Sequence, residues 1–212
     1  MEKKWIDITQ PLTEDIAVWP GDTPYQFDLS YTKKQTGSVN IGQFTTSVHT
    51  GTHVDAPFHF DNNGEKIHQI DPNIYIGPVK IIDVTEHKMI DRSILEAFDL
   101  RGVKRLLLKT EKERDPASFP KEFSVLDTDV GAYLKELGIF LIGTDAPSVD
   151  PVDSKSVSAH HALYKNGVYI LENLLLNKVE SGYYELIALP LKLVGADGSP
   201  VRAVIRPIDL KT

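Results

Sequence analysis

Cysteine is absent from this chain of 212 residues. The protein therefore has no disulfide bond, no thiolate ligand for a metal and no cysteine nucleophile, and a reducing compartment is compatible with that composition. The first residues, Met1 to Ile8, contain no apolar run of the kind found in secretion signals, and no stretch of the chain reaches the length of a membrane span. We expect a cytoplasmic protein without a membrane partner.

Basic residues are fewer than acidic ones. Lys and Arg total 23 against 30 Asp and Glu, which gives a formal net charge of -7. No basic cluster with interleaved aromatic residues occurs, and this argues against nucleic-acid binding. The apolar fraction of 41% is enough for a real core. Because repeats, low-complexity tracts and linkers are missing too, we expect a single domain over residues 1–212.

The hydrophobic pattern predicts strands and turns in the first third of the chain and an alternation of helix and strand afterwards. This order is typical of one α/β domain. A hairpin-like turn is expected around Ala196-Asp197-Gly198-Ser199, between the last two strands. The expected strands are 5–9, 79–84, 105–110, 139–142, 168–171, 184–193 and 201–207, and the expected helices are 91–98, 127–137 and 156–165.

The densest group of reactive side chains lies in the segment 49–60, His-Thr-Gly-Thr-His-Val-Asp-Ala-Pro-Phe-His-Phe. It holds His49, His53, Asp55 and His59. A lone histidine is usually a core or surface residue, but three histidines with an interleaved aspartate reverse that preference. Imidazole nitrogen and carboxylate oxygen suit Zn²⁺ and neighbours such as Mn²⁺ or Co²⁺. The segment therefore predicts a hydrolytic metal centre.

The spacing within this segment predicts a bend. In a straight strand the Cα atoms of His49 and His53 would lie about 13 Å apart, too far to share one ion comfortably. Gly51 supplies conformational freedom between them, and Pro57 interrupts regular strand pairing before His59. A helix would also align the first two histidines, but the residues between them are poor helix formers. We expect a strand that ends in a bent loop.

The role of His59 remains open at this point, because imidazole can serve as a third ligand, as a support for a ligand, or as a free acid and base. A second polar group comes from the later part of the chain. His160 and His161 lie on the helix expected over 156–165, and Glu172 follows the next strand. One of these histidines with Glu172 could complete a half-site around one or two ions. Taken alone, the histidine pair is ordinary helix surface and Glu172 a capping or salt-bridge residue.

Three motifs together resemble the cyclase-like metal-dependent hydrolases. They are the segment 49–60, Val-Trp-Pro-Gly-Asp-Thr-Pro upstream of it, and Ser-Ala-His-His-Ala-Leu-Tyr with Ile-Leu-Glu-Asn-Leu downstream. The resemblance runs from Trp5 to Pro207, and the loop that begins at Trp19 favours the formamidase branch of the family. It implies a single mixed-sheet α/β domain of the swivelling β/β/α type, assembled as a homodimer.

The resemblance also implies a role for individual residues. His49, His53 and Asp55 match the first metal position of the family, with the aspartate bridging to a second ion. The second position uses a histidine and a glutamate twelve residues apart, which matches His160 with Glu172 and leaves His161 unassigned. The implied cofactor is Zn²⁺, two ions per subunit, with Mn²⁺ or another divalent ion as the alternative. Whether His161 or Asp145 contributes to the site is left open.

Two further positions match the family pattern. His59 corresponds to the proton-transfer residue and Trp19 to a substrate-contacting tryptophan. The implied reaction is hydrolysis of a small molecule, N-formyl-L-kynurenine, to L-kynurenine and formate in tryptophan breakdown. Two alternative functions remain. A cyclic-amide hydrolase, acting for example on isatin, would keep the same metal ligands and differ in its substrate pocket. A non-catalytic metal-binding module would keep the ligands without needing His59.

Overall fold

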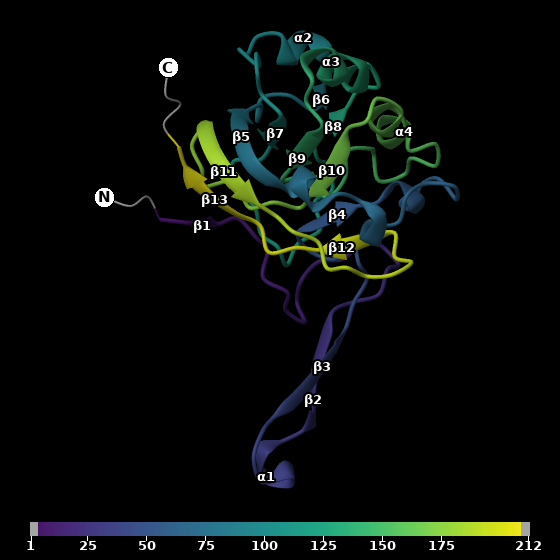
Figure 1. Ribbon diagram of the computed structural model, residues 1–212, viewed down its shortest axis with the longest axis vertical. Coiled ribbons are helices and arrows are strands. Elements are labelled where there is room, and N and C mark those ends of the chain that lie inside the picture. Colours follow the sequence, from purple (N-terminus) through teal and green to yellow (C-terminus); the bar gives the residue numbers. More distant parts are fainter. Residues whose placement is uncertain (1–3, 209–212) are drawn as a thin grey trace.

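A curled mixed sheet runs through the centre of the computed structural model, which describes residues 4–208 (Figure 1). The strand order across this sheet brings the two ends of the described chain together at one edge and the segment 53–55 close to the other. In that order the nine strands are β1 (Ile6–Asp7), β13 (Val204–Pro207), β11 (Gly182–Ile187), β5 (Ile76–Asp83), β7 (Arg105–Lys109), β9 (Leu141–Thr144), β10 (Tyr169–Glu172), β4 (His53–Asp55) and β12 (Gly198–Pro200).

The centre of the sheet is parallel and its margins are antiparallel. Strands β5, β7, β9 and β10 pair in parallel, whereas β4, β11, β12 and β13 join antiparallel to their neighbours. Parallel strands covered on both faces need continuous apolar runs. The run Leu106-Leu107-Leu108 of β7 meets that need: Leu107 packs into one core, while Leu106 and Leu108 pack into the core on the opposite face. The mixed α/β sheet expected from the sequence is confirmed.

Helices α2 (Arg92–Leu95), α3 (Asp129–Leu137) and α4 (Ser158–Lys165) lie together on one side of the parallel strands (Figure 1). Helix α2 is shorter than the expected helix over 91–98, although Asp91 caps it as its Oδ1 accepts from Ile94 N at 3.0 Å. The remaining elements are short. They are α1 (Lys33–Thr36), the 3₁₀ turns η1 (Pro57–His59), η2 (Ile67–Gln69) and η3 (Pro72–Tyr75), and the paired strands β6 (Met89–Ile90) and β8 (Val125–Leu126).

Helices α3 and α4 touch through Gly131. A Cβ atom at this position would lie 2.4 Å from the carbonyl oxygen of Ala162, which belongs to the backbone and has little room to move. We expect Gly131→Ala to lower the free energy of unfolding by about 1–3 kcal/mol, the usual cost of overpacking. Thermal unfolding measures the change, and Ala132→Ser, on the exposed side of the same helix, is the control. Equal melting temperatures for both variants would contradict this close contact.

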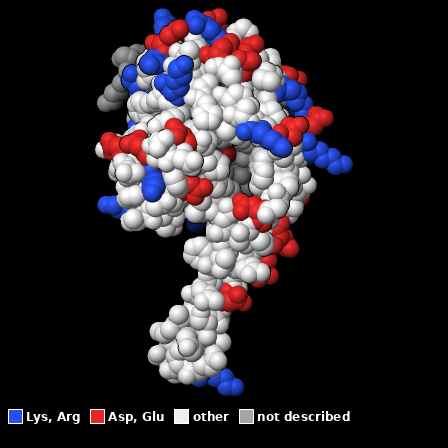
Figure 2. All heavy atoms as spheres, turned by 90° about the vertical axis from the view of Figure 1, so that its right-hand side faces the viewer, with Lys and Arg blue, Asp and Glu red and all other residues white. Residues whose placement is uncertain are grey.

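Strands β2 (Gln26–Tyr31) and β3 (Ile41–Thr45) form a separate hairpin that projects from the body as an arm tipped by α1 (Figure 1). Every residue of both strands is exposed. The exposed residues include five large apolar ones: Phe27, Leu29, Tyr31, Ile41 and Phe44. In Figure 2 the arm carries few charged side chains compared with the body. No strand was predicted from the sequence for residues 26–31.

The two strands expected on either side of Ala196-Asp197-Gly198-Ser199 do pair antiparallel, as β11 with β13, and a bridge between Pro190 and Val201 continues that pairing. The connection between them, however, is not a simple hairpin turn. The expected strand 184–193 ends at Ile187, and Gly198 begins β12, which pairs with β4 and not with β11. In that pairing Gly198 lies opposite Asp55. A Cβ atom at position 198 would lie 2.8 Å from His49 Cε1 and 3.0 Å from the carbonyl oxygen of Val54, so glycine lets this backbone approach the imidazole and the neighbouring strand closely.

The expected first strand, 5–9, is reduced to β1 and an isolated bridge between Thr9 and Leu174.

Within residues 4–208 no helix has the length and apolar character needed to cross a membrane.

Candidate metal centre

Strands β4 and β10 bring the two predicted half-sites together. The strands are antiparallel neighbours, and Glu172 stands directly opposite His53 in the register. Helix α4 supplies His160 from its first turns, while His49 lies in the turn before β4. Together with Asp55 these residues form the histidine–carboxylate cluster: His49, His53, Asp55, His160 and Glu172. All five were expected from the sequence, and all five meet at one place.

The bend expected between the first two histidines is present. Gly51 has a φ of 66°, in the left-handed region that suits glycine. The turn places the carbonyl oxygen of Gly51 2.9 Å from His53 Nδ1. This hydrogen bond fixes the imidazole and leaves Nε2 facing the carboxylates, 3.4 Å from Asp55 Oδ1 and 3.4 Å from Glu172 Oε2.

Two groups of potential metal ligands share Asp55. The first is His49, His53 and Asp55, and the second is Asp55, His160 and Glu172; in each group the ligand atoms lie within 4.8 Å of one another. His160 Nε2 lies 3.4 Å from Asp55 Oδ2 and 3.7 Å from Glu172 Oε1. Two ligand atoms bound tetrahedrally to one ion at 2.0–2.2 Å would be about 3.4 Å apart. The spacing therefore suits ligands better than direct hydrogen bonds.

A buried oxygen supports this interpretation. Asp55 is 3% exposed, and its Oδ2 has no hydrogen-bond partner among residues 4–208. A buried carboxylate oxygen without a donor is costly unless a cation compensates it. Together with the nitrogen and oxygen donors around it, this atom makes the cluster chemically suited to a divalent metal ion.

The carboxylates also control the charge of the imidazoles. Burial by itself lowers the pKa of His53, but Asp55 and Glu172 outweigh it and raise this pKa to about 10. Burial likewise opposes the effect of Asp150 and Asp55 on His160, whose pKa rises to about 10. Burial opposes ionisation of Asp55, yet three histidines hold the pKa of its carboxyl well below the usual range. An ion that enters the cluster would displace the imidazole protons.

Asp150 positions His160. Its Oδ2 lies 2.6 Å from His160 Nδ1 and accepts from His160 N at 3.0 Å, while Oδ1 accepts from Ala159 N at 3.0 Å. The carboxylate thus satisfies backbone donors at the start of α4 and directs the other ring nitrogen at the cluster. Asp150 was not predicted from the sequence. The only local signal was an acidic residue ahead of the helix, set apart by a proline-containing loop.

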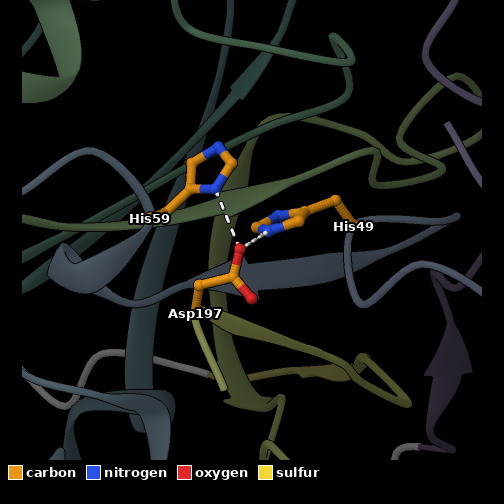
Figure 3. A group of neighbouring side chains, drawn as sticks. All are labelled: His49, His59 and Asp197. Atoms are coloured by element: carbon orange, nitrogen blue, oxygen red, sulfur yellow. Dashed lines mark hydrogen bonds and ion pairs between the residues drawn. The ribbon is translucent and has the colours of Figure 1, made fainter. Parts of the chain in front are cut away.

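Asp197 is the second residue at this site that was not predicted from the sequence. Its Oδ2 lies 2.9 Å from His49 Nε2 and 3.3 Å from His59 Nδ1, so one carboxylate oxygen links both rings (Figure 3). The hydrogen bond with His49, and to a smaller extent that with His59, lowers the pKa of Asp197, so its carboxyl group stays ionised. Asp197 lies in the segment that was expected to be a turn, and nothing local pointed to its role.

The structure sets His59 apart from the other ligand candidates. Its side chain is 38% exposed, and its ring centre lies 4.0 Å from that of His49 and 6.2 Å from that of His160. His161 packs its ring against Phe60 at 5.3 Å and is not part of the cluster. Asp145 lies elsewhere and accepts from Thr110 N at 2.9 Å; burial raises its pKa to about 6.

A cavity of about 280 Å³ opens onto the cluster. Trp19 lies in its wall and meets Phe119 edge to face, with ring centres 5.5 Å apart. The cavity wall also contains apolar and polar residues. The apolar ones are Ala17, Pro147, Pro151, Val152 and Val157, and the polar ones are Asp22, Arg114, Ser148, Ser154 and Asn173. Aromatic rings beside a few convergent polar groups are typical of a small-molecule site.

Known proteins share this fold. The family model described as "Putative cyclase" matches residues 6–151. A solved structure, "The Structure Of Potential Metal-Dependent Hydrolase With Cyclase Activity", superimposes with a TM-score of 0.85 at 28% identity and covers 98% of this chain and 100% of that one. Isatin hydrolase A from Labrenzia aggregata shares the fold, with a TM-score of 0.82 at 22% identity over 97% of this chain and 94% of that one.

The chain belongs to the cyclase family. Among its relatives, the kynurenine formamidase of Bacillus cereus is 55% identical over 205 residues, which are 97% of this chain and 98% of the relative. The kynurenine formamidase of Bacillus mycoides is 56% identical over the same shares. The resemblance that the sequence motifs indicated is thereby confirmed.

Proposed function

We propose that this protein hydrolyses N-formyl-L-kynurenine to L-kynurenine and formate, the arylformamidase step of tryptophan breakdown. The observation that carries the proposal is the near-full-length identity of 55% to a kynurenine formamidase. The site supports it with a ligand cluster for a divalent metal beside a cavity walled by Trp19 and Phe119. An aryl ketone with an ortho formamide fits such a combination of rings and polar groups.

We assign metal binding to the histidine–carboxylate cluster, with Asp55 shared by two ions and Zn²⁺ as the preferred metal. Oxygen and nitrogen donors suit Zn²⁺, and Mn²⁺ is the alternative. When bound, such ions supply Lewis acidity, which activates water and polarises a carbonyl oxygen. His53 and Glu172 hold their donor atoms in place through β4 and β10, and Asp150 fixes the ring of His160.

We assign proton transfer to His59. Cleavage of the formamide C–N bond expels an aryl amine, and this leaving group needs a proton. His59 Nδ1 donates to Asp197 Oδ2, which leaves the other ring nitrogen available to the substrate. The partial exposure of this ring in the cavity wall lets it meet a bound molecule. A metal-binding module without activity has no use for such a residue.

The exposed apolar residues of the arm, the hairpin of β2 and β3, are our reason to propose a homodimer. A two-stranded hairpin is marginally stable on its own, and the strands of this one present Phe27, Tyr31 and Phe44 to solvent. A second copy of the chain would cover these side chains, and sedimentation at several concentrations measures the assembly. We further propose a cytoplasmic location, as expected for an enzyme of amino-acid breakdown.

The activity test uses metal-reconstituted protein and N-formyl-L-kynurenine, with the appearance of kynurenine absorbance as the readout. We expect turnover that stops when a chelator removes the metal and returns when the ion is added back. Isatin is the comparison substrate, since the isatin hydrolases of similar structure share the fold. Faster hydrolysis of isatin than of the formamide would contradict the proposal.

Trp19 is expected to bind the aryl ring of the substrate. Replacing Trp19 by Ala removes one side of the aromatic wall, and we expect KM to rise roughly 10-fold with a smaller change in kcat, because stacking acts on bound substrate and transition state alike. The matched control is Trp5→Ala: this second tryptophan is 41% exposed and lies against Arg206, away from the cavity. If Trp19→Ala lowers thermal stability without raising KM, the indole only anchors its loop.

A further inference from the structure

Arg114 lies in the cavity wall on the connection between β7 and β8, with 6% of its side chain exposed. Its Nη2 donates to Asn173 Oδ1 at 3.0 Å. Its Nη1 reaches the two carboxylate oxygens of Glu111 only at 3.4 and 3.5 Å. Its Nε has no hydrogen-bond partner within residues 4–208. A guanidinium has five N–H donors, so this buried cation has unused capacity to bind an acceptor.

A second buried arginine in the same fold has a guanidinium whose hydrogen bonds go to backbone carbonyl groups. Arg105 is 7% exposed, and its guanidinium donates to three backbone carbonyl oxygens: Ile74 O at 2.6 Å, Asn73 O at 2.5 Å and Pro78 O at 3.4 Å. Those contacts tie η3 to the sheet and explain the burial of Arg105. The contacts of Arg114 are longer and go to side chains, and they leave the guanidinium at a cavity instead of against backbone.

The position of Arg114 relative to the cluster is fixed by Asn173. This residue follows Glu172 directly, and its φ of 57° turns the chain as it leaves β10. Its carboxamide oxygen accepts from Arg114 and, at 3.4 Å, from Gln10 Nε2. The loops around the cavity are joined as well, because Ala17 N donates to Pro116 O at 2.8 Å. The cation is therefore held beside the reacting centre and beside the loop of Trp19.

We propose that Arg114 binds the α-carboxylate of the substrate and thereby determines specificity for aryl formamides that carry an amino-acid side chain. A planar guanidinium matches a carboxylate through two parallel hydrogen bonds, and these bonds are stronger when both partners are charged. Asp22, on the loop of Trp19, also lines the cavity and supplies a carboxylate for the α-ammonium group. This inference rests on the proposed function.

The test compares two formamides on metal-loaded protein. N-formyl-L-kynurenine carries the amino-acid group, and 2′-formamidoacetophenone has the same ring, ketone and formamide without it. For Arg114→Met we expect kcat/KM to fall about 100-fold with the first substrate and less than about 3-fold with the second, since a hydrogen-bonded charge is lost only in the first case. Arg114→Lys should recover part of the loss, because it restores the charge without the planar fork.

Arg105→Met is the matched control. It should lower thermal stability, because buried carbonyl groups lose their donor, and it should treat the two substrates alike. An equal loss on both substrates in a folded Arg114→Met protein would assign Arg114 to the ion pair with Glu111 and overturn the proposal. Equal kcat/KM values of the unaltered protein for both formamides would overturn it too. Inactivity of the unaltered, metal-loaded protein on both would instead refute the proposed function, and this inference with it.

Discussion

Replacing His59 by Ala is expected to lower kcat about 100- to 10,000-fold, the usual range for a positioned acid or base, while the metal content stays unchanged. The reason is geometric: five other residues form the histidine–carboxylate cluster, and His59, with 38% of its side chain exposed, meets it through the ring of His49 at a centre distance of 4.0 Å. Elemental analysis and steady-state kinetics on the same preparation measure both quantities. His161→Ala is the control, since that ring packs on Phe60 outside the cluster.

The leaving group offers a second measurement on His59→Ala. A formanilide with an electron-withdrawing ring expels a less basic amine, and we expect the loss in kcat to shrink for such a substrate because it needs less protonation. The structure also defines the competing outcome. His49, His59 and Asp197 themselves form a group of potential ligands. Loss of metal in His59→Ala, with activity restored by added ion, would make His59 a ligand and leave the proton donor unidentified.

Replacing Asp55 by Ala is expected to empty both metal positions and abolish measurable activity. Its two carboxylate oxygens face different partners: Oδ1 lies near His49 and His53, and Oδ2 near His160. Glu172→Ala should mainly empty the position that it shares with His160. Elemental analysis after dialysis counts the ions in each variant.

Asp55→Asn keeps the volume of the side chain, and circular dichroism checks that each protein is folded. Asp145→Asn is the control for loss of a buried carboxylate elsewhere. Full metal content in Asp55→Ala would remove the shared ligand from the proposed site.

Much of the candidate site could be predicted from the sequence because the residues of its first half lie close together along the chain. His49, His53 and Asp55 lie within one short segment, and the need for a bend at Gly51 followed from strand geometry alone. The second half depended on a family pattern, since neither composition nor periodicity distinguishes His160 from His161. The structure supplies the physical difference: Asp150 caps the start of α4 and directs the ring of His160, not His161, into the cluster.

The missing parts depend on pairings between distant segments. Asp197 reaches His49 because β12 joins β4 across more than 140 residues of sequence, and a hydrophobic pattern reports only on neighbours along the chain. Arg114 was overlooked because a lone arginine in a charged loop is usually solvated; its burial became visible only with Asn173 beside it. The arm escaped notice because both of its strands are exposed, and exposed strands show no clear alternation.

The passage of β12 beside His49 has a consequence for how the centre is assembled. The imidazole of His49 lies close to the backbone at Gly198, its ring centre is 4.0 Å from that of His59, and its two nitrogens contact Asp55 and Asp197. A hydrogen bond at each nitrogen holds this ring in its observed orientation. All of these contacts come from the protein itself, so the pairing of β12 with β4 preorganises the ring. Loading of the site therefore requires exchange of protons at His49 and no search among rotamers.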